Sequence, residues 1–152
     1  MATTSKRDAE LLEVTAKLRL AIARTARRLR QEAGSDLSPT LTSALASIER
    51  HGPLTPSELA AVERVQRPTA TRIASRLEGD ELIARTADPN DGRGSLLAVS
   101  ARGRELLRRL RTRKNAYLSR RLRELDDTDV NALARAADIL ERLLEDERAK
   151  AS

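Results

Sequence analysis

Apolar residues recur at helical spacing along most of this chain of 152 residues. From residue 5 to residue 32 they are spaced by three, four or seven positions, which predicts one long amphipathic helix with Leu11, Val14, Leu18, Ile22 and Leu29 on its apolar side. Ser5 with Asp8 predicts a capping box at its start, and Gly34-Ser35-Asp36 predicts its end. So long a stripe needs a partner, either elsewhere in this chain or, as we favour, in a second copy.

Three further stretches have the same periodicity. Ser38 and Pro39 predict the start of a helix that ends at Gly52-Pro53. Ser100 predicts the start of another helix running to about Glu124, and an acidic turn at 126–129 precedes a last one. Leu41, Ala44, Leu45 and Ile48 of the first of these helices are predicted to face inward. The apolar side of the second consists of Leu106, Leu107, Leu110, Tyr117, Leu118 and Leu122. In the last helix Val130, Leu133, Ala137, Leu140 and Leu144 form a second apolar stripe that needs a partner.

The segment from residue 54 to residue 79 predicts two short helices joined by a turn. Thr55 can cap the first helix, because Pro56 favours a first helical turn and Glu58 completes a capping box. Leu59 and Val62 are its expected apolar positions. The second helix is predicted over 66–79, and its buried stripe consists of Ala70, Ile73, Ala74 and Leu77.

A β-hairpin is predicted next, because two apolar segments, 82–87 and 95–100, flank a turn cluster over 88–93. Pro89 presets a turn, and Asp91-Gly92 is expected to supply the positive φ of a tight reversal. Arg93 should then project beside the tip, in a form suited to a DNA minor groove. Arg102 and Arg104 follow the hairpin directly and are further candidates for phosphate contacts.

The polar face of the second short helix carries the strongest functional signal. Between Arg64 and Leu77 there are four arginines, three hydroxyl residues and no acid. Guanidinium groups and short hydrogen-bond donors suit phosphates and guanine edges. An ordinary solvated face is the alternative, although such faces usually mix acidic and basic residues in i, i+4 pairs. The predicted DNA contacts are Arg64, Gln66, Arg67, Thr69, Thr71, Arg72, Ser75 and Arg76, together with Arg93 of the hairpin.

Four motifs in this order resemble the MarR-type winged-helix regulators. They are Leu54-Thr55-Pro56-Ser57-Glu58-Leu59-Ala60, Arg67-Pro68-Thr69-Ala70-Thr71-Arg72-Ile73 with Leu77-Glu78, Asp88-Pro89-Asn90-Asp91-Gly92-Arg93, and Ser100-Ala101-Arg102-Gly103. The resemblance implies that the helix holding Thr69, Thr71, Arg72 and Arg76 lies in the major groove, and that Arg93 enters the minor groove. Two positions depart from the family pattern: Asn90 replaces a common wing arginine, and Gln66 replaces a common serine cap.

The expected fold is therefore mainly α with a small β-hairpin wing. We expect a single domain over 1–152, in which a winged helix-turn-helix lobe (36–101) is flanked by a helical dimerisation stem (5–33 and 102–150). The resemblance implies that the first and last helices interleave across a twofold axis. A dimer carries two DNA-binding lobes related by this axis. It therefore predicts a pseudopalindromic double-stranded DNA operator, with half-sites about 10–10.5 bp apart from centre to centre.

Composition narrows the function classes. The net charge of +6 favours a polyanionic partner, and the absence of cysteine excludes disulfides and thiolate metal sites. We expect no cofactor and no metal, since a single histidine, His51, offers too few ligands, and no catalytic residues, since no nucleophile with a base is recognisable. No apolar run exceeds four residues, so we expect a cytoplasmic protein without a membrane partner.

These observations favour a dimeric, sequence-specific transcriptional regulator over its rivals. The family resemblance implies a repressor released by a small aromatic or anionic ligand, although no residues spell out a ligand pocket. Arg19, Arg24 and His51 are candidate anion contacts by location only. The main alternative is an architectural DNA-binding protein with little sequence preference, and an enzyme is the weakest option.

Overall fold

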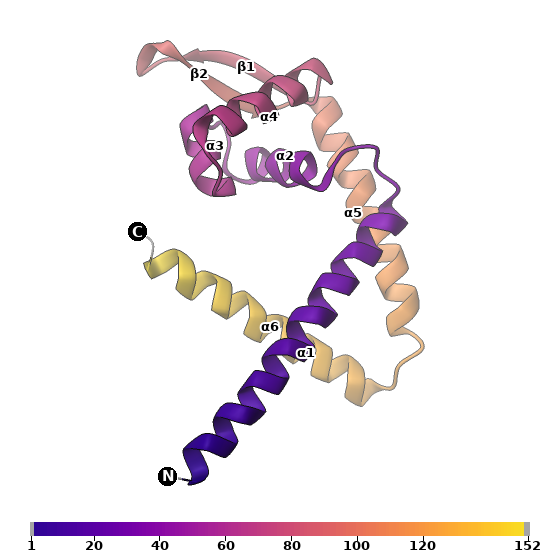
Figure 1. Ribbon diagram of the computed structural model, residues 1–152. Coiled ribbons are helices and arrows are strands. Elements are labelled where there is room, and N and C mark those ends of the chain that lie inside the picture. Colours follow the sequence, from indigo (N-terminus) through magenta and orange to yellow (C-terminus); the bar gives the residue numbers. More distant parts are fainter. Residues whose placement is uncertain (1, 151–152) are drawn as a thin grey trace. The chain divides into compact units, whose positions relative to one another are not determined.

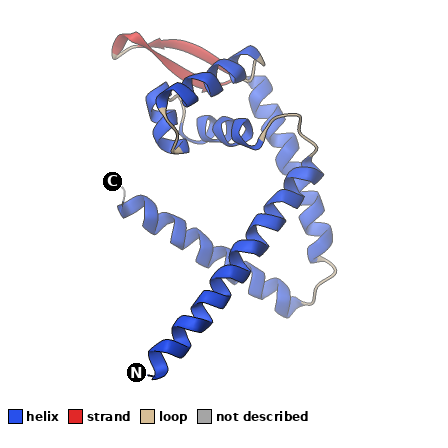
Figure 2. Ribbon diagram, in the orientation of Figure 1, coloured by secondary structure: helices blue, strands red, loops and turns tan. Residues whose placement is uncertain are grey.

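The computed structural model describes the backbone of residues 2–150 and the side chains of residues 5–145. Over these residues the chain consists of six helices and one two-stranded antiparallel sheet (Figures 1 and 2), which confirms the mainly α fold with a β-hairpin. In chain order the elements are α1 (Ala2–Ala33), α2 (Pro39–His51), α3 (Pro56–Glu63), α4 (Arg67–Gly79), β1 (Ile83–Asp88), β2 (Asp91–Val99), α5 (Ala101–Leu122) and α6 (Asp127–Lys150).

The chain divides into two compact units, Met1–Lys114 and Asn115–Ser152, and the boundary falls within α5. The division into a lobe over 36–101 and a flanking stem remains a prediction. Among the described residues, none of the helices combines the length and the apolar character needed to cross a bilayer.

The hydrophobic core lies between α2, α3, α4, the base of the hairpin and the start of α5. Its largest fully buried side chains are Leu45, Ile48, Leu59, Leu77 and Leu97. Aliphatic side chains and alanine fill it, because small residues on α4 let that helix approach its neighbours closely. Leu54, between α2 and α3, exchanges two backbone hydrogen bonds with Leu97 of β2, at 3.0 and 2.7 Å. This bridge fixes the hairpin to the helical part of the core.

Helix starts follow the sequence signals at three positions. The hydroxyl of Ser38 accepts a hydrogen bond from the Leu41 N–H at 3.3 Å, and Thr55 forms a complete capping box with Glu58. The hydroxyl of Ser100 accepts from the Gly103 N–H at 3.0 Å, which caps α5. The predicted cap at Ser5 is wrong, because α1 already begins at Ala2 and Ser5 lies inside it.

The hairpin differs from its prediction at the tip. Asp88 pairs with Asp91, so Pro89 and Asn90 form a two-residue turn and β2 begins at Asp91. The positive φ expected at Asp91-Gly92 is absent, and Asn90 has none either, so the turn with Pro89 at its first central position is of the kind that needs no positive φ. Instead, the register shifts between Ala87 and Asp88, and the extra residues of β2 form a bulge that contains Gly92 and Arg93.

Candidate nucleic-acid interface

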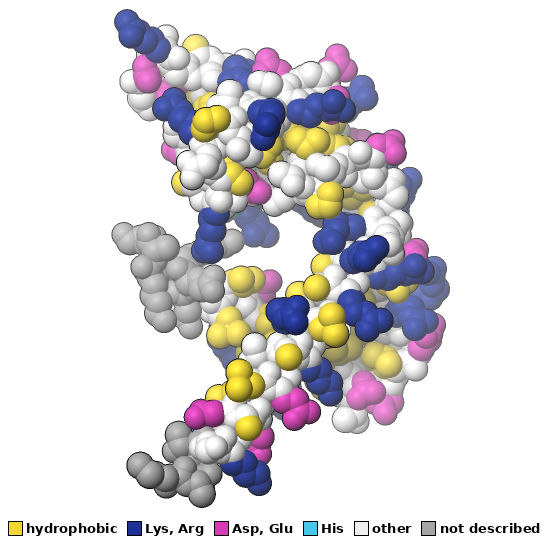
Figure 3. All heavy atoms as spheres, in the orientation of Figure 1, with side chains coloured by type: hydrophobic (Ala, Val, Ile, Leu, Met, Phe, Trp, Pro, Cys, Tyr) yellow, Lys and Arg dark blue, Asp and Glu magenta, His cyan; other side chains and the backbone are white. Residues whose placement is uncertain are grey.

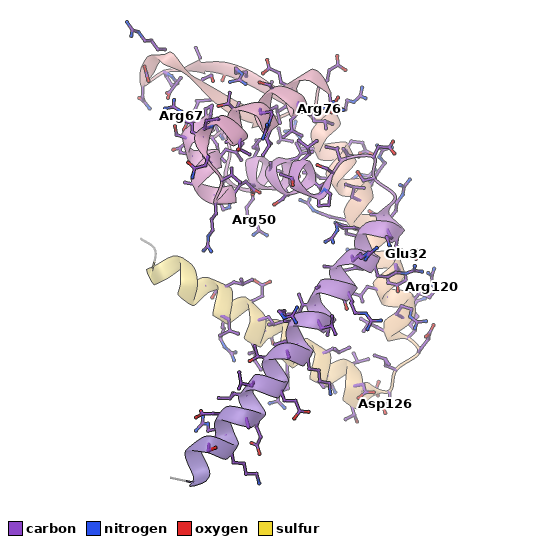
Figure 4. All side chains as sticks on the ribbon, viewed as in Figure 1. Glu32, Arg50, Arg67, Arg76, Arg120 and Asp126 are labelled. Atoms are coloured by element: carbon purple, nitrogen blue, oxygen red, sulfur yellow. The ribbon has the colours of Figure 1, made fainter. Side chains whose placement is uncertain are left out.

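Helix α4 presents its polar face to solvent because its apolar stripe is buried. Ala70, Ala74 and Leu77 are fully buried and Ile73 is 6% exposed. At about 100° per residue, Arg72 and Ser75 project opposite this stripe and Thr71 lies on the flank beside Ser75, and all three are exposed. Arg67 and Arg76, at the two ends of α4, lie on the two flanks of this face and are exposed (Figure 4). Thr69 is half-buried. The structure thus gathers the predicted helix contacts on one surface.

The turn before α4 is held by α2 and α3. Arg64 ends α3 with φ +52°, and the Val65 N–H donates to the Ala60 carbonyl at 3.0 Å. Both oxygens of the Glu63 carboxylate accept hydrogen bonds from hydroxyl groups of α2, one from Ser43 at 2.8 Å and the other from Ser47. Gln66 occupies the N-cap of α4 without a side-chain cap bond. The first N–H groups of α4 are therefore left for solvent or for an anion such as phosphate.

The cations of α4 differ in how strongly the chain itself engages them. Arg76 donates to Asp80 at 3.1 Å, so part of its charge is compensated within the helix. Thr71 donates its hydroxyl to the Arg67 carbonyl at 3.0 Å. In the described part of the chain we find no ion pair for the exposed guanidinium groups of Arg67 and Arg72. These two arginines are the α4 cations most available to a polyanion.

The tip of the hairpin is stiffened by aspartate side chains. Asp88 accepts the Asn90 N–H at 2.9 Å, and Asp91 accepts the Arg93 N–H at 3.1 Å. Such turns fix the backbone locally and leave the side chain of Arg93 exposed. Figure 3 shows Lys and Arg side chains over the exposed side of α4 and at the far end of the hairpin. Two aspartates thus hold the backbone on either side of Asn90 at the tip.

Three arginines near the hairpin are engaged within the chain. Arg102 pairs with Glu81 at 3.3 Å, and Arg104 donates to the Val99 carbonyl at 3.1 Å, so these two hold the start of α5. Arg85 pairs with Glu78 at 2.9 Å and also donates to the hydroxyl of Ser95 at 3.0 Å. We did not single out Arg85 from the sequence, although the alternation of side chains along β1 places it beside the core.

Two crevices open within Met1–Lys114. One, of about 630 Å³, lies between the end of α4 and the start of α5, and both acidic and basic side chains line it. The other, of about 750 Å³, lies between the end of α1, α2 and α5. Alanine, leucine and proline residues line it together with Arg27, Arg30 and Lys114, and no carboxylate does. Arg19, Arg24 and His51, the expected anion contacts, line neither crevice.

Known proteins are similar to this chain in fold and in sequence. The family model described as "MarR family" matches residues 37–95. An HTH-type transcriptional regulator of Mycobacterium tuberculosis is 35% identical over 130 residues, which cover 85% of this chain and 91% of that protein. A crystal structure of a Pseudomonas aeruginosa protein has 34% identity and a TM-score of 0.80, covering 89% of this chain and 96% of the other. A mutant of Staphylococcus aureus MepR, bound to an oligodeoxyribonucleotide, is 18% identical with a TM-score of 0.65, covering 85% and 97%.

Proposed function

The chain belongs to the MarR family of transcriptional regulators, and on that basis we propose that two copies of it bind a pseudopalindromic DNA operator and repress transcription until a small ligand releases them. Its relatives are named as regulators and not as enzymes, in agreement with the sequence analysis. The observation that carries the proposal is the acid-free face of α4, which lies opposite a fully buried stripe.

In this proposal α4 enters the major groove and the wing reaches the adjacent minor groove. Arg72 and Ser75, which project opposite the core, contact base edges together with Thr71 beside them. Arg93 enters the minor groove, where the negative potential favours a guanidinium group. The remaining contacts, to the phosphate backbone or to flanking bases, come from Arg64, Gln66, Arg67, Thr69 and Arg76.

Exposed apolar residues on the terminal helices support a dimer. On α1, Leu12 is 72% exposed and Val14 is 58% exposed, and Figure 3 shows apolar side chains along this helix. Leu143 and Leu144 on α6 are 56% and 55% exposed. Rows of apolar side chains on soluble helices mark interaction surfaces. A second copy of the chain is the occupant we propose, because each copy offers the same two stripes.

The free energies of base recognition also favour two DNA-binding lobes. One lobe makes two or three good base contacts, each worth about 1–3 kcal/mol of discrimination against a wrong base. Nonspecific binding alone gives dissociation constants of about 10⁻⁴–10⁻⁶ M at physiological salt. A dimer with two DNA-binding lobes roughly doubles the free energy of discrimination. Its twofold symmetry places the half-sites about 10–10.5 bp apart, from centre to centre.

The crevice between α1, α2 and α5 is the site we propose for a releasing ligand. Its apolar walls suit an aromatic ring, and Arg27, Arg30 and Lys114 suit a carboxylate or phenolate. A ligand can release DNA only if it binds the unbound arrangement more tightly than the DNA-bound one. Benzoate and salicylate are suitable probes: both should weaken operator binding, and Arg30→Gln should reduce that effect while leaving DNA affinity without ligand unchanged.

Competition binding tests the central claim. The purified protein is titrated onto the DNA upstream of its own gene in the presence of random DNA, and its mass is measured by light scattering. We expect a dimer and a preference of about 10³ or more for the specific DNA. Equal affinity for both DNAs would instead support an architectural protein that coats DNA, and a monomeric mass in the complex would contradict the paired readers.

A further inference from the structure

Arg85 joins the reading helix to both strands of the wing. Its Nε donates to the Glu78 carboxylate in the last turn of α4 at 2.9 Å. Its Nη1 donates to the hydroxyl of Ser95 on β2 at 3.0 Å. The guanidinium group of one β1 residue therefore links its own strand to α4 and to β2.

The pleat of the hairpin explains why this arginine does not project into solvent as Arg93 does. Side chains alternate between the two faces of a strand, so Arg85 shares its face with Ile83, which is 3% exposed. Its cross-strand neighbour is Leu97, which is fully buried, and Ser95 lies two residues further along the same face. Arg85 thus extends from the core side of the hairpin, and its side chain is only 29% exposed.

We propose that Arg85 is a positioning residue for DNA binding: with Glu78 and Ser95 it holds the wing at a fixed angle to α4, so that Arg93 and the arginines of α4 reach adjacent grooves together. This inference rests on the proposed function. Arg85 is a cation on the wing of a DNA-binding lobe, but in this proposal it does not contact DNA.

The wing needs contacts that hold it against α4 because it is small. A two-stranded hairpin is marginally stable by itself. The tip of this one, residues 88–94, consists of a turn and a bulge, and none of its residues belongs to the hydrophobic core. A wing that moved freely would lose conformational entropy when it entered the groove, which weakens binding. Fixing the hairpin to α4 before DNA arrives removes part of that cost.

The sign of one substitution separates this proposal from simple electrostatics. Glu78→Gln removes a negative charge from the lobe, so charge alone predicts tighter binding to DNA. Positioning predicts weaker binding, by about twofold to fivefold, because Arg85 loses its ionic partner. Arg85→Gln should weaken binding by a similar factor. The control is Glu105→Gln, which removes the same charge and breaks an exposed pair with Arg108 on α5, and which should not weaken binding.

A double-mutant cycle tests the link to the wing tip. Arg93→Ala should cost less affinity in the Glu78→Gln background than in the wild type, since a loosened wing contributes less. Amide hydrogen exchange without DNA should be faster at residues 91–95 in Glu78→Gln and unchanged in Glu105→Gln. Melting temperatures establish that every variant is folded at the assay temperature.

The outcomes distinguish the two claims. If the wild type prefers its own upstream DNA and Glu78→Gln binds equally or more tightly, the positioning role is overturned and the proposed function stands. If Arg85→Gln weakens binding while Glu78→Gln does not, Arg85 contacts DNA directly and the inference is again overturned. If the wild type shows no DNA preference, the proposed function fails. Unchanged amide exchange at residues 91–95 in Glu78→Gln would show, without DNA, that the pair of Arg85 with Glu78 does not hold the wing, and would overturn the positioning role.

Discussion

The hydroxyl of Ser43 on α2 donates a hydrogen bond of 2.8 Å to the Glu63 carboxylate at the end of α3. Ser47, one turn further along α2, donates to the other oxygen of the same carboxylate. Glu63 immediately precedes Arg64, where the backbone turns through a left-handed conformation toward α4. The position at which α4 begins is therefore fixed by a polar contact between α2 and α3 as well as by the apolar core.

Replacing Glu63 with alanine should destabilise the protein, because hydrogen bonds to a charged group contribute more than neutral ones. We expect the free energy of unfolding to fall by about 1–2 kcal/mol, allowing for the partial exposure of the site. Urea denaturation followed by circular dichroism measures this change. Glu105→Ala is the control: its pair with Arg108 is fully exposed, and it should change stability little.

Gly103 tolerates no side chain at its position in the first turn of α5. A Cβ atom there would overlap the Leu82 carbonyl oxygen and lie 2.9 Å from Cγ2 of Val99. Gly103→Ala should therefore cost about 1–3 kcal/mol, because the base of the hairpin must move. Gly92→Ala is the matched control, since its Cβ meets no atom within 4 Å. Equal melting temperatures for the two variants would contradict this close packing.

Glu81 has φ +60°, a conformation that L-residues other than glycine seldom adopt. Glu81→Gly should raise the free energy of unfolding by up to about 1 kcal/mol. Relief of about 1–2 kcal/mol of steric strain exceeds the advantage of roughly 0.4–1 kcal/mol that glycine gives the unfolded chain. Glu81→Ala removes the exposed pair with Arg102 but keeps the Cβ atom, so it should give no such gain in thermal denaturation.

Arg72 is expected to read base identity. Arg72→Ala should reduce discrimination at one base position in each half-site, at a cost of about 1–3 kcal/mol. Binding selections from a randomised operator would show this as a lost preference at one symmetric pair of positions. A uniform loss of affinity with unchanged base preference would mean that Arg72 contacts only the phosphate backbone.

Arg93 should behave differently from Arg72. Arg93→Ala is expected to weaken binding similarly for all sequences and to lower the slope of log K against log salt concentration by about one. Titrations at several salt concentrations measure that slope. An unchanged slope, together with unchanged affinity, would place the tip of the wing outside the DNA complex.

Local signals in the sequence predicted most of the helical elements correctly. Thr55, Pro56 and Glu58 define the start of α3 because the capping groups are neighbours in the chain. The stripe of α4 is buried as its periodicity predicts. Local reading also produced errors: Ser5 is not a cap, and the positive φ expected at Asp91-Gly92 is absent. Of the two apolar positions expected on α3, Leu59 is buried and Val62 is 43% exposed.

The sequence by itself determined which residues carry positive charge without nearby acids, and on which face of a helix they lie, because helical periodicity follows from spacing alone. Only the tertiary structure decided what those charges meet. Arg85 and Arg93 are both arginines of one hairpin, yet the pleat and the bulge turn the first toward Glu78 and leave the second exposed. Contacts between residues that are distant in the chain depend on strand register and helix packing, which short-range patterns do not specify.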